Sequence, residues 1–419
     1  MQAYAQILLI AMPAFLVLVL FEKFWGWYKG NDTVRVNDMI SSLSSGITNV
    51  TKDVLGLSIG IISYVWLYDH LALIHIPTSG WTYLLAFIAL DFAGYWVHRI
   101  AHEYNLFWNN HIIHHSSEEF NLACALRQSI SNVVRVFAVF LLPAALIGIE
   151  PQVIGAVGPL HLFAQFWYHT RHIGKMGLLE HIIVTPSHHR VHHAINPEYL
   201  DKNYSEIFIF WDKLFGTFQP ELTDVPCVYG VTRPVRTWNP IKINFMHLGL
   251  LIRDAWNTRN LADKFRIWFM PLGWRPADVQ NRFPVYKVED VFTFEKYDTK
   301  ESLPVKCWFA FQLMMVLIFL TFWFANIQTI PLTQMFWYGG FIFLSIYAIT
   351  EQMDHSLTAP WFEGLRLAFV VLVIVFTGDW FGVSAFWTGV PFIIVTYLTF
   401  SFILSILIYR SDKNSSITV

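Results

Sequence analysis

Long apolar runs dominate the chain and predict helices that cross a membrane. Because a helix needs about 20 apolar residues to cross a bilayer, the runs predict an all-α, polytopic integral membrane protein with about nine spans. The spans are expected near 6–21, 54–76, 81–97, 136–149, 153–168, 307–325, 333–349, 365–377 and 386–408. The fourth and fifth runs are short and are separated by Glu150 and Pro151, which favours a helical hairpin that crosses only part of the bilayer.

The polar stretches between these runs divide the chain into three expected parts. Residues 1–80 form N-terminal spans, and residues 307–419 form a C-terminal region of four spans. The central part, 81–306, combines spans with the largest polar stretch, 169–306, which is rich in Pro, Gly, Asn and Asp. Those residues are typical of loops and short helices, so a helical cap outside the bilayer is expected there.

Composition supports the membrane interpretation and excludes other classes. Hydrophobic residues make up 55% of the chain and charged residues 14%, against roughly 25% charged residues in soluble domains. A disordered protein, a disulfide scaffold and an ordinary cytosolic enzyme are therefore excluded. The net charge of −2 provides no basic field for nucleic acid, and the three cysteines have no metal-ligand spacing.

Basic residues at the ends of the apolar runs predict the orientation. Lys23, Lys29 and Arg35 follow the first run, Arg99 follows the third, and Arg410 follows the last. Because cytosolic loops are enriched in Lys and Arg, we expect these ends and the cap in the cytosol. The expected location is the endoplasmic reticulum or a bacterial inner membrane.

Histidine is the residue type that stands out. There are 17 histidines, and most lie between His98 and His193. They form one HxxxH motif and two HxxHH motifs, in which the i and i+4 imidazoles share one helix face. The eight motif histidines are His98, His102, His111, His114, His115, His189, His192 and His193.

The clustering of these histidines predicts a metal centre. A single histidine is more often structural than metal-binding, but imidazoles gathered at a membrane boundary are costly unless something uses them. Eight ligands, with His169 as a ninth, are too many for one ion and indicate two. Imidazole suits Zn, Cu, Fe and Ni, and two irons that activate O₂ beside a lipid fit the membrane setting best.

Carboxylates and amides near the motifs are candidates for orienting the imidazoles. Asp91, Glu103 and Asn203 are the expected catalytic residues, and Glu118, Glu119 and Asp201 are further candidates that could equally be loop charges or helix caps. Arg127 and Arg190 are cations within the motif region that could contact a lipid headgroup or a reductant.

The motifs resemble those of the membrane-bound fatty acid hydroxylase and sterol desaturase superfamily, and within it the alkylglycerol monooxygenases. The resemblance covers about half the chain, residues 85–280, and is carried by HRIAHE at 98–103, HHSSEEFNLACALRQS at 114–129, QFWYHT at 165–170, TPSHHRVHH at 185–193, DKNY at 201–204, WDKLFGTF at 211–218 and VYGVT at 228–232. Arg171 departs from the acidic residue that the animal enzymes tend to have there, which makes His172 a rival of His169.

The resemblance implies a di-iron centre held by His98, His102, His111, His114, His115, His169, His189, His192 and His193, with His188 as a tenth ligand or a supporting group. It also implies that Glu103 is essential and that tetrahydrobiopterin is the reductant. An ether lipid such as an alkylglycerol is the implied substrate, hydroxylated by O₂ next to its ether oxygen.

Two alternatives stay open at this point. Within the superfamily, the substrate could be a fatty acyl chain, a sterol or a carotenoid, with a redox protein as electron donor. In another class, the histidines could serve a membrane metal transporter. Transport predicts ligands spaced along a path through the bilayer, whereas these motifs lie at the ends of predicted spans on one face.

Overall fold

A computed structural model describes residues 2–417, with side chains described for residues 4–410. The protein is mostly helical, as the apolar runs predict. The strands of the described chain are two short ones, β1 (Ile59–Gly60) and β2 (Val134–Arg135), which pair in parallel. The all-α membrane fold class is thus confirmed.

Among residues 2–417, six helices are long and apolar enough to cross a membrane. Their apolar side chains continue around the whole helix, as expected for segments that face lipid and packed neighbours together. The helices are α1 (Gln2–Tyr28), α4 (Gly80–Glu103), α14 (Leu303–Ala325), α15 (Leu332–Met353), α16 (Ala359–Thr377) and α17 (Val390–Ile417). The chain is therefore a multi-pass membrane protein.

Three of the nine predicted spans form shorter helices. The run 54–76 contains β1 and one short helix, α3 (Tyr64–Leu71), and the pair 136–149 and 153–168 forms η2 (Phe137–Leu141), α7 (Leu142–Leu146) and α8 (Pro151–Phe163). The 13 residues of α8 extend for only about 20 Å. Helices η2, α7 and α8 pack against the lower half of α4. The hairpin that they form is thus too short to cross the bilayer and lies against the side of a membrane span.

Helix α2 (Val36–Val54) lies in a segment for which the apolar pattern predicts no span. Its buried face is rich in serine and threonine, and Ser41 donates a hydrogen bond of 2.7 Å to the carbonyl of Trp238. It packs against α14, α15 and α11 (Pro240–Asn257). Helix α2 thus joins the N-terminal and C-terminal spans to the central part of the chain.

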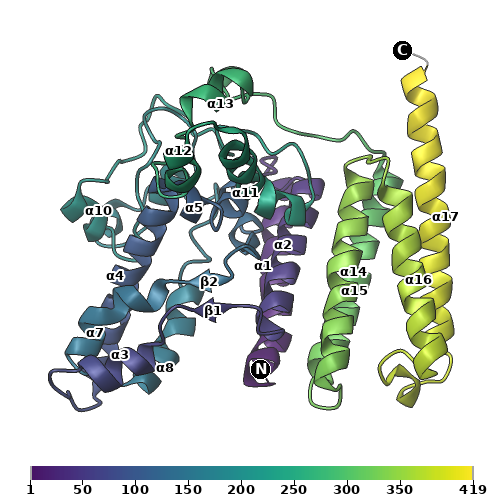
Figure 1. Cartoon of the computed structure of the whole chain (residues 1–419), viewed down its shortest axis with the longest axis horizontal. Coiled ribbons are helices and arrows are strands. Elements are labelled where there is room, and N and C mark those ends of the chain that lie inside the picture. Colours follow the sequence, from purple (N-terminus) through teal and green to yellow (C-terminus); the bar gives the residue numbers. More distant parts are fainter. Residues whose placement is uncertain (1, 418–419) are drawn as a thin grey trace.

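The expected helical cap gathers at the end of the molecule where α4 ends (Figure 1). Its helices are short, apart from the 18-residue α11, because Gly, Pro and Asn interrupt the sequence every few residues. They are α5 (Asn105–Trp108), α6 (Ile112–His115), η1 (Cys124–Leu126), η3 (Gly177–His181), α9 (Pro186–His192), α10 (Phe210–Phe215), α11, α12 (Leu261–Arg266), α13 (Ala277–Arg282) and η4 (Val291–Thr293). The C-terminal spans stand beside them, with η5 (Val383–Ala385) in the loop between α16 and α17.

Candidate metal centre

The last two turns of α4 present His98 and His102 on one face of the helix. The helix begins with a capping box at Ser79 and Thr82 and continues unbroken to Glu103. Because positions i and i+4 lie one above the other on a helix, both imidazoles point toward the same neighbours. The predicted HxxxH geometry is present.

The two HxxHH motifs occupy short helices that approach α4 from the cap. His111 precedes α6, whose last two residues are His114 and His115. The other motif lies on α9 and its C-cap residue His193. Pro186 at the first position of α9 starts that helix, since proline at this position loses no hydrogen bond and its φ is already helical.

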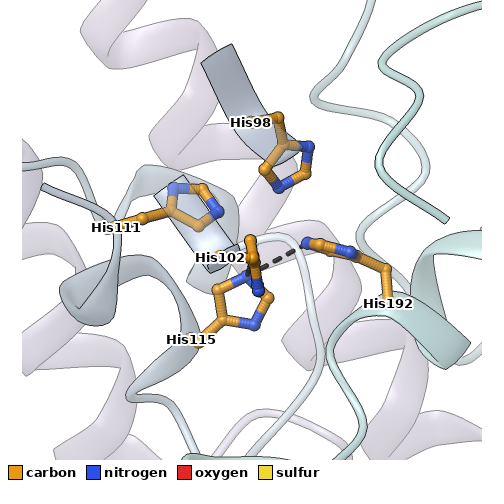
Figure 2. A group of neighbouring side chains, drawn as sticks. All are labelled: His98, His102, His111, His115 and His192. Carbon is orange, nitrogen blue, oxygen red and sulfur yellow. Dashed lines mark hydrogen bonds between the residues drawn. The ribbon is translucent and has the colours of Figure 1, made fainter. Parts of the chain in front are cut away.

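The structure brings the nine predicted ligands together in two adjacent groups. In each group, one nitrogen from every member lies within 4.8 Å of the others. The first group, shown in Figure 2, contains His98, His102, His111, His115 and His192. The second contains His114, His169, His189 and His193.

Each HxxHH motif divides its histidines between the two groups. His111 and His115, at i and i+4, belong to the first group, while His114 belongs to the second. The other motif does the reverse, because His189 and His193 join the second group and His192 joins the first. The two groups also touch, with the rings of His115 and His193 stacked 4.3 Å apart. This interlocked arrangement fits two ions close together.

The ring nitrogens of each group converge on one nitrogen, which lies within hydrogen-bond distance of two others although a neutral imidazole nitrogen can share only one proton. In the first group, Nε2 of His115 lies 3.1 Å from Nε2 of His102 and 3.0 Å from Nε2 of His192. In the second, Nε2 of His189 lies 2.8 Å from Nε2 of His169 and 3.0 Å from Nε2 of His193. Such short separations call for something that all the nitrogens can bind.

Backbone carbonyls determine which nitrogen carries the proton in four of the nine rings. Nδ1 of four histidines donates to a carbonyl: His98 to Tyr204 at 2.8 Å, His192 to Lys202 at 3.0 Å, His169 to Gln165 at 3.1 Å and His114 to Arg127 at 3.3 Å. In a neutral imidazole, Nε2 then keeps its lone pair and can only accept or coordinate.

Several of these nitrogens lack a protein donor. Nε2 of His114 and Nε2 of His169 face each other at 3.5 Å although both rings donate from Nδ1. Nε2 of His98 and Nε2 of His111 are buried without a hydrogen-bond partner. A cation in each group satisfies every one of these nitrogens, so the donor set fits two metal ions.

Burial keeps these imidazoles neutral. Desolvation lowers the pKa of His115 and His193 well below the usual value, and the neighbouring imidazoles lower it further. Burial likewise lowers the pKa of His114 to about 3. Since metals bind the deprotonated ring, the site is ready to coordinate at neutral pH.

The rival ligands lie elsewhere. His172 is half-buried, and its Nε2 lies 3.2 Å from the hydroxyl of Thr33. His188 forms a capping box with Thr185 at the start of α9 and packs against Phe218. Of the two rivals, His169 is therefore the one that lies in the second histidine group, and His188 caps α9.

Asp91 and Asn203, two of the three expected catalytic residues, form hydrogen bonds to the backbone of segments around the two histidine groups. Asp91 accepts hydrogen bonds from the backbone of Ile207 (2.8 Å) and Phe208 (3.0 Å) and from Nε1 of Trp211 (2.9 Å). Asn203, with a left-handed φ of 56°, donates to the carbonyl of His188. Neither side chain belongs to the two histidine groups, and a catalytic role for either stays a prediction.

Glu103 ends α4 with a partly exposed carboxylate that accepts a hydrogen bond of 2.7 Å from Arg99. The structure places it one residue from His102 and pairs it with that arginine. Its essential role stays a prediction.

The departure at Arg171 has a local explanation. Arg171 donates to the buried carboxylate of Glu119 at 3.1 Å, and Lys296 binds the same carboxylate at 2.7 Å. Arg127 is fully buried and pairs with Asp38 at 2.7 Å, while Arg190 pairs with Glu221. Arg127 and Arg190 are hydrogen-bonded within the protein, so neither is a free headgroup contact.

Sequence reasoning missed several residues that support the centre. Glu22 of α1 reaches Thr170, and His161 binds Asp91 at 3.0 Å with Glu206 beside it. Asp91, His161 and Glu206 lie close enough to form a third group of metal-type ligands. For Glu22 the available signal was a carboxylate directly at the end of the first apolar run, where a charge is costly unless it has a partner. Glu206 and the carbonyls of Lys202 and Tyr204 have no signal in the sequence.

Comparisons with known proteins agree with the motifs. Residues 83–217 match the model of the fatty acid hydroxylase family. The alkylglycerol monooxygenase of Homo sapiens is 36% identical over 86% of this chain and 81% of its own length. That of Xenopus tropicalis is 34% identical over 84% of this chain and 78% of its own length.

A more distant relative is the ornithine lipid hydroxylase OlsE of Rhizobium tropici, which is 30% identical over 34% of this chain and 44% of its own length. No solved structure matches the chain significantly.

Proposed function

The chain belongs to the alkylglycerol monooxygenase family, and from this premise we propose that it oxidises ether lipids with O₂ at a di-iron centre. It is a multi-pass membrane oxidoreductase that hydroxylates a lipid and depends on metal. The observation that carries the proposal is the pair of interlocked groups of five and four histidines. Nine imidazoles with free lone pairs match two ions of the kind that such hydroxylation needs.

The ligands of the two proposed irons are the members of the two groups. His98, His102, His111, His115 and His192 would hold one ion, and His114, His169, His189 and His193 the other. When bound, two adjacent irons supply the oxidising power to insert an oxygen atom of O₂ into an unactivated C–H bond. We propose iron as the metal, O₂ as the oxidant and a reduced pterin as one possible electron donor.

The residues of the chain prepare the site for this chemistry. The carbonyls of Lys202, Tyr204, Gln165 and Arg127 hold four imidazoles in one tautomer and orientation. Phe120 is fully buried and lies against His169 and His193, so that it excludes water from the second group. Exclusion of water protects a strongly oxidising centre from side reactions.

The proposed reaction consumes one O₂, two electrons and two protons per lipid. One oxygen atom enters the C–H bond beside the ether oxygen, and the other leaves as water. The resulting hemiacetal breaks its C–O bond to give an aldehyde and a glycerol derivative. A reduced pterin, tetrahydrobiopterin by family resemblance, or a redox protein would supply the electrons from the cytosolic side, in the endoplasmic reticulum or a bacterial inner membrane.

The experiment is a turnover assay on the purified, iron-loaded protein in detergent or nanodiscs. An alkylglycerol, a fatty acyl lipid and a sterol are supplied in parallel, each with reduced pterin or with reduced ferredoxin. Aldehyde formed only from the alkylglycerol and only with pterin supports the proposal. Hydroxylation of an acyl chain or a sterol with ferredoxin would move the protein to another branch of the superfamily.

Metal transport receives no support from the arrangement. A transport path needs ligands at successive depths, whereas all nine histidines converge in two touching groups. Uptake of iron into sealed proteoliposomes would nevertheless contradict the enzyme proposal if it occurred without lipid oxidation.

A further inference from the structure

An exposed apolar surface lies on the cap beside α4. It consists of five side chains from η3, α10 and the residues next to them, and we name it the ribbon surface. They are Leu178 (83% exposed), Leu214 (66%), Ile182 (58%), Leu179 (44%) and Phe210 (39%). A patch of this kind marks an interaction site on a protein, because singly exposed apolar residues are common and clustered ones are not.

The backbone joins these side chains into one surface. Ile183 pairs with Phe208 in an antiparallel bridge, and the N–H of Ile209 donates to the carbonyl of Ile182 at 3.2 Å. Nζ of Lys213 binds the carbonyl of His181 at 3.2 Å, which brings α10 against η3. The two segments therefore move as one unit.

Packing against α4 fixes the depth of this unit. Trp211 packs on Phe92 with ring centroids 5.2 Å apart, and Phe215 packs on Trp96 at 4.9 Å. The carboxylate of Asp91 accepts hydrogen bonds from Phe208 and Trp211, so it fastens the ribbon to the helix. Figure 1 shows α10 beside the upper half of α4.

This depth lies within the membrane. Asp91 and Trp96 lie about 10–18 Å before the end of α4, since a helix rises about 1.5 Å per residue. The 24 residues of α4 extend for about 36 Å, only slightly more than the roughly 30 Å hydrocarbon layer. The helix end can therefore project into water by only about 6 Å, which leaves Asp91 and Trp96 below the lipid boundary.

Charge on the ribbon agrees with this placement. Its exposed charged side chains are Lys175 and Lys213. The long stem of Lys175 can carry its ammonium group up to the headgroups, while Nζ of Lys213 binds the carbonyl of His181. Its carboxylate, Glu180, turns inward and accepts a hydrogen bond of 2.7 Å from Ser187. Basic residues beside apolar ones are typical of elements that lie in an anionic leaflet.

We propose that the ribbon surface is immersed in one leaflet of the bilayer, so that the metal-bearing cap is embedded in lipid and does not sit above it. The occupant of the surface is the lipid bilayer. Both ends of the ribbon continue into the metal centre, through α9 on one side and through the carbonyls of Lys202 and Tyr204 on the other. The leaflet thus supports the segments that hold His189, His192 and His98.

Site-directed spin labelling tests this inference without any activity measurement, so its result is independent of the proposed reaction. In a Cys307→Ser background, Leu178→Cys or Leu214→Cys receives a nitroxide, since Cys307 is the exposed thiol of the described chain. Tyr286→Cys on the cap, 66% exposed, is the water-side control, and Leu372→Cys on α16, 54% exposed, is the lipid-side control.

In anionic-lipid nanodiscs, O₂ and a water-soluble nickel chelate compete to relax each label. Labels at 178 and 214 should be relaxed mainly by O₂, as at 372, while the label at 286 should be relaxed mainly by the chelate. Chelate access at 178 and 214 equal to that at 286 would overturn the proposal. Dipolar broadening at 214 that disappears on mixing with unlabelled protein would assign the surface to a second copy of the chain and would equally overturn it.

Discussion

The carboxylate of Glu22 in the first membrane span accepts a hydrogen bond of 2.6 Å from the hydroxyl of Thr170, the residue that follows His169. Its other oxygen accepts an N–H from Leu122, also at 2.6 Å. One buried carboxylate of α1 therefore connects the segment after the second histidine motif to the segment that carries His169. The N-terminal span acts as part of the metal centre's framework, not only as an anchor.

Replacing Glu22 should loosen the second histidine group. A buried hydrogen bond to a charged group contributes about 1.5–3 kcal/mol, and Glu22→Ala removes two acceptors together. We expect a lower Tm and a loss of metal from one of the two sites, measured by elemental analysis. Glu22→Gln keeps one acceptor and should be intermediate. The exposed Glu198→Gln is the control, and metal content equal to wild type in Glu22→Ala would contradict the framework role.

Neighbouring histidines of one motif should affect different metal sites. His192 belongs to the first group and His193 to the second, although the two residues are adjacent. We expect His192→Ala and His193→Ala each to retain about half the metal and to lose turnover by at least about 100-fold, since supporting residues alone cost 10–100-fold. Mössbauer spectra should show different remaining iron environments.

Two histidines outside the two groups, one exposed and one buried, serve as controls for these variants. His181 is exposed, so His181→Ala should behave as wild type in every measurement. His247 is buried with its Nε2 2.9 Å from the carbonyl of Asn105, so His247→Ala should lower Tm without releasing metal. Identical spectra for the His192 and His193 variants would mean that the motif does not divide its ligands.

Much of this centre was predictable from the sequence, and the reasons are physical. HxxxH and HxxHH spacing determines which imidazoles share a helix face, and nine histidines gathered beside spans indicate metal ligation more strongly than packing. Backbone carbonyls have no sequence signature, so the acceptors at Lys202 and Tyr204 could not be found. Asp91 is a second example. It lies on the same face of α4 as His98, which led to the prediction of a role beside the metals. Its hydrogen-bond partners at 207–211 could not be predicted, because they are distant in sequence.

The span count shows the same limit for the fold. Hydropathy identifies apolar runs, but it does not distinguish a helix that crosses the bilayer from short helices packed against one. Pro151 and the turn before it divide a run that would otherwise be long enough, and α8 then covers α4 at Val153 and Val157. Six spans meet the length requirement within the described residues 2–417, compared with about nine predicted.

Glu118 should give the protein a pH-dependent stability. Burial is the main cause that raises the pKa of this carboxyl to about 7. Because its pKa is higher in the folded state than in the unfolded state, the folded protein holds the proton more tightly. The stabilisation is therefore complete below about pH 4.5 and is lost as the pH rises through 7.

Glu118→Gln removes this dependence, since the amide stays neutral and keeps an acceptor for the N–H of Tyr297. At pH 8.5 we expect the variant to have the higher Tm and a free energy of unfolding larger by an amount on the order of 1–3 kcal/mol. Near pH 5 it should match wild type. Thermal unfolding across this range measures it. A variant less stable than wild type at pH 8.5, with the difference vanishing near pH 5, would instead show that the carboxylate form is the stabilising one.

The C-terminal spans should be needed to hold the cap closed over the metals. Asp354, at the end of α15, accepts hydrogen bonds from the backbone of Trp238 at 2.7 Å and from the hydroxyls of Thr237 and Tyr297. Trp238 in turn accepts from Ser41 of α2, and the N–H of Tyr297 binds Glu118, three residues after His115. These hydrogen bonds thus lead from the C-terminal bundle to Glu118, three residues along the chain from His115 of the first histidine group.

Asp354→Asn replaces one of the two acceptor oxygens with a donor, so at least one of these hydrogen bonds is lost. We expect faster release of iron to a chelator and faster proteolysis of the 283–302 segment than in wild type. Asp379→Asn is the matched control, because Asp379 makes comparable bonds to Trp380 and Ser384 in the loop between α16 and α17. That variant should lower Tm while leaving iron release unchanged. Equal iron release in the two variants would mean that the bundle stabilises the protein without restraining the cap.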